Sequence, residues 1–235
     1  MAALLSVLPK LGVLFVIVQL ELYNKALFIA ALLSIIVGAI GALNQTRIKR
    51  LLAYSSIGHM GFILLGLAIG DIVSIQAGIV YMVAYILTQI LLWSIILTTA
   101  LDKDSIIELG AIYRVTPILG LTLAVGLLSA AGIPPLAGFL TKWYIVVAAI
   151  NQGYYVSALI ALAFSVVSGV YYLRIIKIIF YQPRSSLFTI TKVLRGDYPK
   201  VNLSKALLMG GSLYIIITVI LCPNTLLQLV HLVII

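Results

Sequence analysis

The chain has 235 residues, of which 63% are hydrophobic and only 9% charged, and its mean hydropathy is +1.24. Soluble domains carry about 25% charged residues, so the composition excludes a soluble domain and predicts an integral membrane protein. The formal net charge of +9 does not indicate nucleic-acid binding, because the cations lie in short connectors between apolar runs. A single cysteine, Cys222, excludes an internal disulfide and a cysteine-based metal site.

Seven apolar segments follow one another along the chain. A bilayer core of about 30 Å needs about 20 apolar residues in a spanning helix. No segment shows the alternation of a β-strand, so each predicts a helix. The segments cover residues 3–21, 26–44, 51–70, 74–100, 116–150, 154–180 and 205–230. We therefore predict an all-α polytopic membrane protein with about seven transmembrane helices.

The fifth segment is too long for one straight span, since its 35 residues would reach about 52 Å as a helix. It contains Gly132, Pro134 and Pro135, and the two prolines remove backbone donors and clash with the preceding turn. We predict two half-helices, 116–130 and 136–150, joined by an unwound stretch. Such a break is tolerated at membrane depth only where it is buried in protein or lines a wet cavity, as at the centre of transporters.

The basic residues predict the orientation of the chain. With seven spans, 12 of the 15 basic residues fall in connectors on one side of the membrane. Positive residues mark the inner side, so we expect the N-terminus inside and the C-terminus outside. The long basic connector 181–204 lies on the inner side; it is a solvated surface loop or, alternatively, a contact with a partner subunit.

Two lysines lie inside apolar segments: Lys10, which follows Pro9, and Lys142, which follows the predicted break. A lysine at the centre of a membrane helix costs roughly 2.5–3.5 kcal/mol, so we expect both to serve an ion or proton path. Burial disfavours the charged form of a lysine, which suits it to proton exchange. Pro9 is expected to kink its helix and free a backbone carbonyl beside Lys10. The alternative is a lysine that snorkels to the membrane surface.

His59 lies midway along the third segment, with Ser55 and Ser56 one turn earlier on the same face. A histidine titrates near neutral pH and can relay protons. The alternative is a structural hydrogen bond to a neighbouring helix. Gly66 and Gly70 on the same segment have the spacing of small residues that predicts close helix packing.

The fourth segment carries Tyr81, Tyr85 and Gln89 at spacings of four residues. They form one polar stripe, which either holds water molecules or joins helices. All six acidic residues lie at segment ends or in connectors. A proton path built on lysine normally needs a carboxylate partner, so this chain predicts an incomplete path. It contains no motif for a metal, a cofactor or redox chemistry, and we expect none to be bound here.

Three stretches occur in a recognisable order: PK within an apolar helix, QTRIKRLLAYSSIGHMGF and AGIPPLAGFLTKWY. Together they resemble the subunit 2 family of respiratory complex I (NADH:ubiquinone oxidoreductase), whose members are antiporter-like membrane subunits. The resemblance is weakest over 181–235. It implies fourteen helices with two inverted five-helix repeats, of which this chain matches helices eight to fourteen. The matching parts are the linking helix 1–22, the repeat 23–181 with its broken helix, the matrix-side loop 182–204 and the last helix 205–235.

By motif, Lys10 matches the lysine of the family's eighth helix, Lys142 that of the broken twelfth helix and His59 the histidine of the tenth. The resemblance implies that these three residues transfer protons, while Pro9 and the Gly132–Pro135 stretch shape the helix breaks. It also implies the mitochondrial inner membrane, with the N-terminus in the matrix and the C-terminus in the intermembrane space. FMN, iron–sulfur clusters and ubiquinone would belong to other subunits.

Helices one to seven of the family pattern have no counterpart in this sequence. Because the chain opens at Met1, we expect a split subunit whose first half is a separate polypeptide; loss of that half is the alternative. The expected function is proton translocation in the membrane arm, with other membrane-arm subunits and lipids as partners and no nucleic acid. The alternatives are a non-pumping structural scaffold of the same arm and a free-standing cation/proton antiporter fragment.

Overall fold

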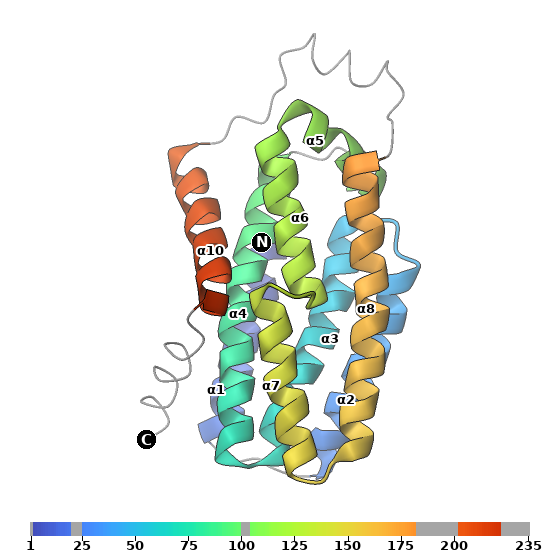
Figure 1. Cartoon of the computed structure of the whole chain (residues 1–235), viewed down its shortest axis with the longest axis vertical. Coiled ribbons are helices and arrows are strands. Elements are labelled where there is room, and N and C mark those ends of the chain that lie inside the picture. Colours follow the sequence, from blue (N-terminus) through green and yellow to red (C-terminus); the bar gives the residue numbers. More distant parts are fainter. Residues whose placement is uncertain (1, 20–24, 100–103, 182–201, 222–235) are drawn as a thin grey trace.

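The computed structural model describes residues 2–19, 25–99, 104–181 and 202–221, which form a bundle of roughly parallel helices (Figure 1). Apart from one isolated β-bridge between Arg47 and Ser105, the described residues contain no β-structure. The predicted all-α class is confirmed. The helices are α1 (Ala2–Gln19), α2 (Lys25–Leu43), α3 (Ile48–Ile69), α4 (Ile72–Thr98), α6 (Pro117–Ala131), α7 (Ala137–Asn151), α8 (Tyr155–Tyr181) and α10 (Leu203–Leu221).

Four of these helices, α2, α3, α4 and α8, are long and apolar enough to cross a membrane. The remaining helices α1, α6, α7 and α10 contain shorter apolar stretches. Helices are favoured in such apolar runs because every backbone N–H and C=O must be bonded within the segment when water is absent. Most of the predicted basic loop, residues 182–201, and the end of the last predicted helix, residues 222–235 with Cys222, lie outside the described residues.

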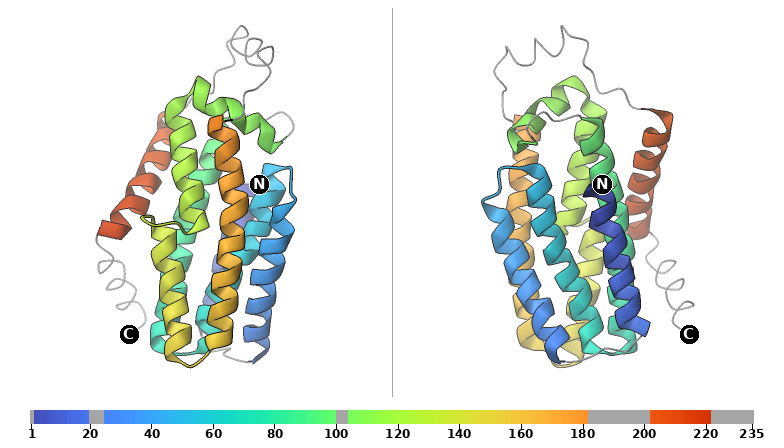
Figure 2. Two further views of the ribbon diagram at one scale, coloured as in Figure 1. Left: turned by 45° about the vertical axis from the view of Figure 1, so that its right-hand side comes forward. Right: turned by 180° about the vertical axis from the view of Figure 1, so that it is seen from behind.

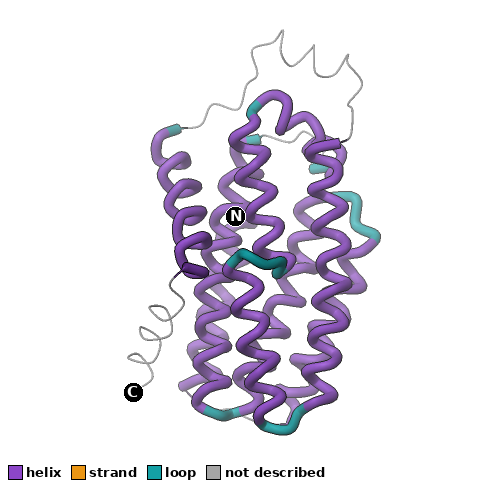
Figure 3. The backbone as a smooth tube through the Cα atoms, viewed as in Figure 1, coloured by secondary structure: helices purple, strands orange, loops and turns teal. Residues whose placement is uncertain are grey.

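The predicted broken helix is present as α6 and α7, which follow one another end to end (Figure 1). Figure 3 shows the loop between them at about mid-height of the bundle. Pro117 stands in the first turn of α6, and Gly132 ends that helix with a left-handed φ of 80°. The Pro134–Pro135 peptide is cis, and Leu136 is extended immediately before α7. Proline cannot continue α6, so the break falls where the sequence predicts it.

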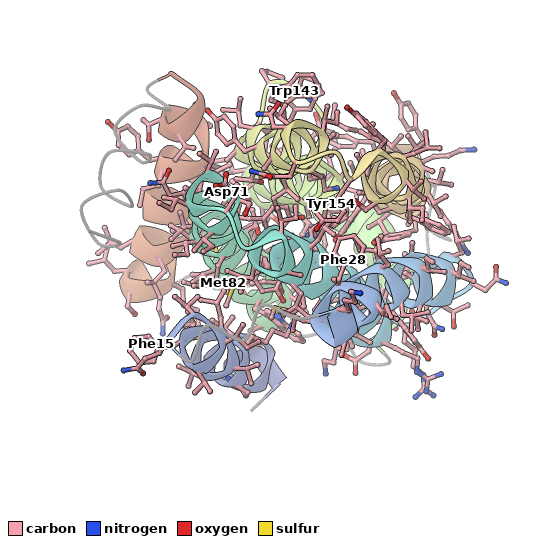
Figure 4. All side chains as sticks on the ribbon, turned by 90° about the horizontal axis from the view of Figure 1, so that it is seen from below. Phe15, Phe28, Asp71, Met82, Trp143 and Tyr154 are labelled. Carbon is pink, nitrogen blue, oxygen red and sulfur yellow. The ribbon has the colours of Figure 1, made fainter. Side chains whose placement is uncertain are left out.

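Helix α4 packs against α1, α3, α6, α7 and α10 (Figure 2). Figure 4 looks along the bundle and shows Phe15 of α1 and Trp143 of α7 on its outside, whereas Phe28 lies beside Tyr154 near one end. The last two rings are 5.1 Å apart between centroids. Phe15 and Trp143 are 64% and 52% exposed. Large exposed apolar side chains are what a membrane-spanning bundle presents to its surroundings.

The close packing predicted from Gly66 and Gly70 is correct for Gly66 alone. A Cβ on Gly66 would lie 3.1 Å from the carbonyl oxygen of Ser74 and 3.2 Å from the Cα of Gly78, so α3 and α4 approach closely there. Gly70 instead ends α3 with a left-handed φ of 78°. A glycine adopts this conformation without the steric cost of a Cβ, which explains its place at the helix end.

The described part of the connector between α4 and α6 has helical structure. It contains a short 3-10 helix, η1 (Ile106–Ala111), and one helical turn, α5 (Ile112–Val115). The Ile48 N–H donates to the Asp104 carbonyl at 2.9 Å, and the Ile106 N–H donates to the Thr46 carbonyl at 3.0 Å. These bonds join the connector to the start of α3.

Candidate functional site

A layer of polar side chains separates two apolar clusters in the bundle. On α3, one cluster extends to Leu52 and the other begins at Phe62, with Ser55 and His59 between them. On α8, Ser168 lies between Ala161 of one cluster and Tyr171 of the other. We call this the polar layer; its buried members are Ser55, His59, Thr88, Gln89, Ser129, Thr141, Lys142 and Ser168.

The polar layer coincides with the break between α6 and α7, since Ser129 comes from the end of α6 and Lys142 from α7. Charged and polar side chains are costly in a membrane interior, so they are retained where they find partners or serve transport. The layer therefore marks the candidate site.

Lys142 is bound to the carboxyl end of α6. Its Nζ donates to the Ala131 carbonyl at 2.7 Å, and the Ala130 carbonyl and Ser168 Oγ are each 3.5 Å away. The Nζ also lies 5.5 Å from the centroid of the Phe62 ring, where a cation is attracted to the face of the ring. A helix carries about half a negative charge at its carboxyl end. In the described structure, this helix end is the negative partner of Lys142 in place of a carboxylate.

His59 is held between two tyrosines from different helices. Its Nδ1 lies 2.8 Å from the Tyr81 hydroxyl of α4, and its Nε2 lies 3.1 Å from the Tyr172 hydroxyl of α8. Tyr172 is in turn hydrogen-bonded to Ser55 Oγ. A tyrosine hydroxyl can donate or accept, so either neutral tautomer of His59 fits between these two groups.

Lys10 points into the bundle rather than toward the membrane surface. Its Nζ donates to the Tyr85 hydroxyl at 2.8 Å and lies 5.0 Å from the centroid of that ring. Helix α1 continues through Pro9, and the described partner of Lys10 is this tyrosine rather than a backbone carbonyl. The contact joins α1 to α4.

Two small cavities adjoin His59. The first is lined by polar groups of Ser55, His59, Lys142, Ser168 and Tyr171, together with apolar side chains. Its volume of about 10 Å³ has room for about one water molecule. His59 and Lys142 therefore border the same cavity.

The second cavity, also of about 10 Å³, lies on another side of His59. Its polar lining comes from His59, Tyr81, Tyr85, Thr88, Ser129 and Thr141. Tyr85 binds Lys10. The residues that line the two cavities, with His59 bordering both, therefore form an interrupted series of polar groups between Lys10 and Lys142.

The predicted stripe on α4 divides into two parts. Tyr81 and Tyr85 contact His59 and Lys10, whereas both polar atoms of the Gln89 side chain are buried without a hydrogen-bond partner in the described part of the chain. Ser56 donates to the Ala53 carbonyl of its own helix.

Four residues of the site were not predicted from the sequence: Tyr172, Ser168, Ser129 and Phe62. The signal for the first two was present, because both are polar groups inside the long apolar segment 154–180. Ser129 lies just before the predicted break, within another apolar segment. No cluster of histidine, cysteine or acidic residues able to hold a metal ion occurs in the described ranges.

Comparison with known proteins finds relatives among the membrane subunits of NADH:quinone oxidoreductases and Mrp antiporters. A family model described as the transmembrane region of NADH:quinone oxidoreductases and Mrp antiporters matches residues 1–168. The chain is 44% identical over 229 residues to NADH-ubiquinone oxidoreductase chain 2 of Metridium senile, covering 97% of this chain and 59% of that relative. It is 38% identical over 213 residues to NADH-quinone oxidoreductase subunit N of Wolbachia sp. subsp. Brugia malayi, covering 90% of this chain and 43% of that relative.

Solved structures share the arrangement of the helices. A chain of respiratory complex I from Thermus thermophilus matches with a TM-score of 0.74 at 31% identity, covering 87% of this chain and 45% of that one. A chain of the Mrp complex from Dietzia matches with a TM-score of 0.78 at 19% identity, covering 97% and 51%, which shows a shared fold. The chain spans about half the length of the relatives it matches. It belongs to the family of NADH:quinone oxidoreductase and Mrp antiporter transmembrane proteins.

Proposed function

We propose that this chain is the C-terminal, antiporter-like half of a membrane-arm subunit of a proton-translocating NADH:ubiquinone oxidoreductase. Relatives are named as subunits of NADH-ubiquinone and NADH-quinone oxidoreductases. The chain would contribute to the enzyme without redox chemistry of its own, while FMN, iron–sulfur clusters and ubiquinone would be bound by other subunits. The proposed location is the mitochondrial inner membrane, with the N-terminus on the matrix side and the C-terminus on the intermembrane-space side.

The observation that carries the proposal is the position of His59 between two water-sized cavities, one reaching Lys142 and the other reaching the tyrosine that holds Lys10. In the proposed mechanism Lys142 exchanges protons with the outer side of the membrane. Lys10 receives protons or a change of charge from the other half of the subunit, and His59 with its tyrosines relays between the two lysines.

The carboxyl end of α6 gives Lys142 two distinct states. The protonated amine is attracted to the Ala131 carbonyl and to the negative helix end. Loss of the proton removes that attraction and leaves an amine that can accept a hydrogen bond from water in the first cavity. A charge change elsewhere in the complex would then shift the balance between the two states, which is the electrostatic coupling that pumping requires.

The test is Lys142→Met in the assembled complex. The described partner of Lys142 is a neutral carbonyl, so the substitution leaves no unpaired charge in the bundle and we expect assembly to be retained. NADH-driven proton pumping should fall while electron transfer from NADH to an artificial acceptor is unchanged. Lys177→Met is the matched control, since Lys177 lies on α8 at an exposed position. Unchanged pumping with intact assembly would refute the role of Lys142.

A structural scaffold without pumping is the second candidate. It is favoured by the position of the described acidic residues Asp71, Asp104 and Glu108, which lie at a helix end or in a connector and not in the polar layer. Under this hypothesis, Lys142→Met and Lys177→Met would leave pumping equally unchanged. A free-standing antiporter fragment would instead exchange cations for protons without NADH.

A separate polypeptide that supplies the first seven helices remains a prediction. Native mass spectrometry of the mildly solubilised complex tests it, together with the proposed partners in the membrane arm. An NADH-oxidising assembly that contains this chain and a second polypeptide with the first half of the family pattern would support it. Absence of this chain from every redox assembly would overturn the proposed function itself.

A further inference from the structure

Ser129 is fully buried at the end of α6, and its Oγ has no hydrogen-bond partner among the described residues. Three other hydroxyl groups of the polar layer donate to a backbone carbonyl of their own helix: Thr88 to Tyr85 at 2.8 Å, Thr141 to Gly138 at 3.1 Å and Ser168 to Ser165 at 2.7 Å. Ser55 is hydrogen-bonded to the Tyr172 hydroxyl. A buried hydroxyl that makes no hydrogen bond is destabilising, so the orientation of the Ser129 side chain requires a reason.

That reason is the second cavity, which Ser129 lines. The cavity has room for about one water molecule, and it also borders His59 and the tyrosines Tyr81 and Tyr85. A buried water needs two to four polar partners, and a hydroxyl oxygen beside two phenol groups provides them. The place is therefore polar enough, and large enough, for a bound water.

We propose that Ser129 holds a single water molecule in the second cavity, and that this water connects the Tyr85 hydroxyl with the Tyr81 hydroxyl. This inference rests on the proposed proton path and adds a residue to it. On one side of the water, Tyr85 accepts a hydrogen bond from Lys10. On the other side, Tyr81 lies against Nδ1 of His59. The two tyrosines are four residues apart on one face of α4, so both can reach a water that lies beside that face.

The three groups between the ends, Tyr85, the water and Tyr81, each accept one proton and release another, so their charge is unchanged, whereas Lys10 becomes a neutral amine and His59 an imidazolium. A proton leaving Lys10 is taken by the Tyr85 hydroxyl, which gives its own proton to the water. The water gives a proton to the Tyr81 hydroxyl, and Tyr81 gives one to Nδ1 of His59. Ser129 acts as a positioning residue, because its hydroxyl orients the water and keeps its own proton.

The first test is Ser129→Ala in the assembled complex. The substitution removes a hydroxyl that bonds to no described protein atom, so we expect assembly to be retained and thermal stability to change little. NADH-driven pumping should become about two- to ten-fold slower, the effect of losing one hydrogen bond to the transfer water. The matched control is Ser165→Ala on α8, whose hydroxyl bonds to its own helix outside the polar layer; it should pump at the normal rate.

A high-resolution density map of the complex provides the second measurement. We expect a water peak within hydrogen-bonding distance of Ser129 Oγ, and its loss or displacement in Ser129→Ala. A map in which the cavity shows no water, or in which the serine hydroxyl bonds to a backbone carbonyl, would overturn the inference.

The outcomes separate this inference from the proposed function. If Lys142→Met stops pumping while Ser129→Ala behaves like Ser165→Ala, the water assignment is wrong and the proton path stands. If neither Lys142→Met nor Ser129→Ala alters pumping, the proposed function fails as well.

Discussion

Replacing Gly132 by alanine tests the link between the helix break and Lys142. Gly132 has a φ of 80°, and a Cβ there would lie 2.8 Å from Lys142 Cδ and 3.0 Å from its Nζ. The left-handed conformation costs a residue with a Cβ roughly 1–2 kcal/mol. Displacing the ammonium from the Ala131 carbonyl would cost about 1.5–3 kcal/mol more, the typical contribution of a hydrogen bond to a charged group. We expect a total destabilisation of about 2.5–5 kcal/mol.

The chain provides a matched control in Gly153, which has a φ of 81° and where an added Cβ would have no other atom within 4 Å. Gly153→Ala should therefore show the backbone cost alone, about 1–2 kcal/mol. The assay compares the temperature at which the complex loses activity with the rate of NADH-driven proton pumping. We expect pumping to fall about tenfold or more in Gly132→Ala and to be nearly normal in Gly153→Ala. Equal effects of the two substitutions on pumping would refute the idea that Gly132 makes room for the lysine.

Three further substitutions test other contacts. Gly138→Ala should prevent stable assembly, because its Cβ would overlap a backbone carbonyl oxygen of α6, whereas Gly169→Ala, with open space around it, should assemble normally; native gel electrophoresis measures both. Tyr85→Phe should slow pumping with little loss of assembly, since it removes the hydroxyl that binds Lys10; equal pumping rates in Tyr85→Phe and the unmodified protein would contradict this. Ser74→Ala should destabilise the start of α4 by about 0.5–2 kcal/mol, measured by thermal unfolding, because its hydroxyl bonds to the N-cap backbone.

The sequence was sufficient to predict the helical class, the approximate helix positions and the break. Long apolar runs allow few alternatives to a helix, because their backbone groups must be bonded internally. Pro134 and Pro135 prevent a continuous helix for a local reason that needs no tertiary information. Lys10, His59 and Lys142 could be singled out because polar groups are conspicuous within apolar segments.

The partners of these residues were decided by the tertiary structure. Tyr172 is 113 positions from His59 along the chain, and only the packing of α8 against the other helices brings the two together. The negative partner of Lys142 is the end of a helix, and backbone carbonyls carry no mark in the sequence. The regular spacing of Tyr81, Tyr85 and Gln89 likewise suggested one stripe, although the glutamine has different surroundings from the two tyrosines. Local sequence patterns determine which side chains are buried, because burial follows from the apolar segments. Hydrogen bonds depend on atomic positions to within a few tenths of an ångström, and the packing of the helices sets these positions.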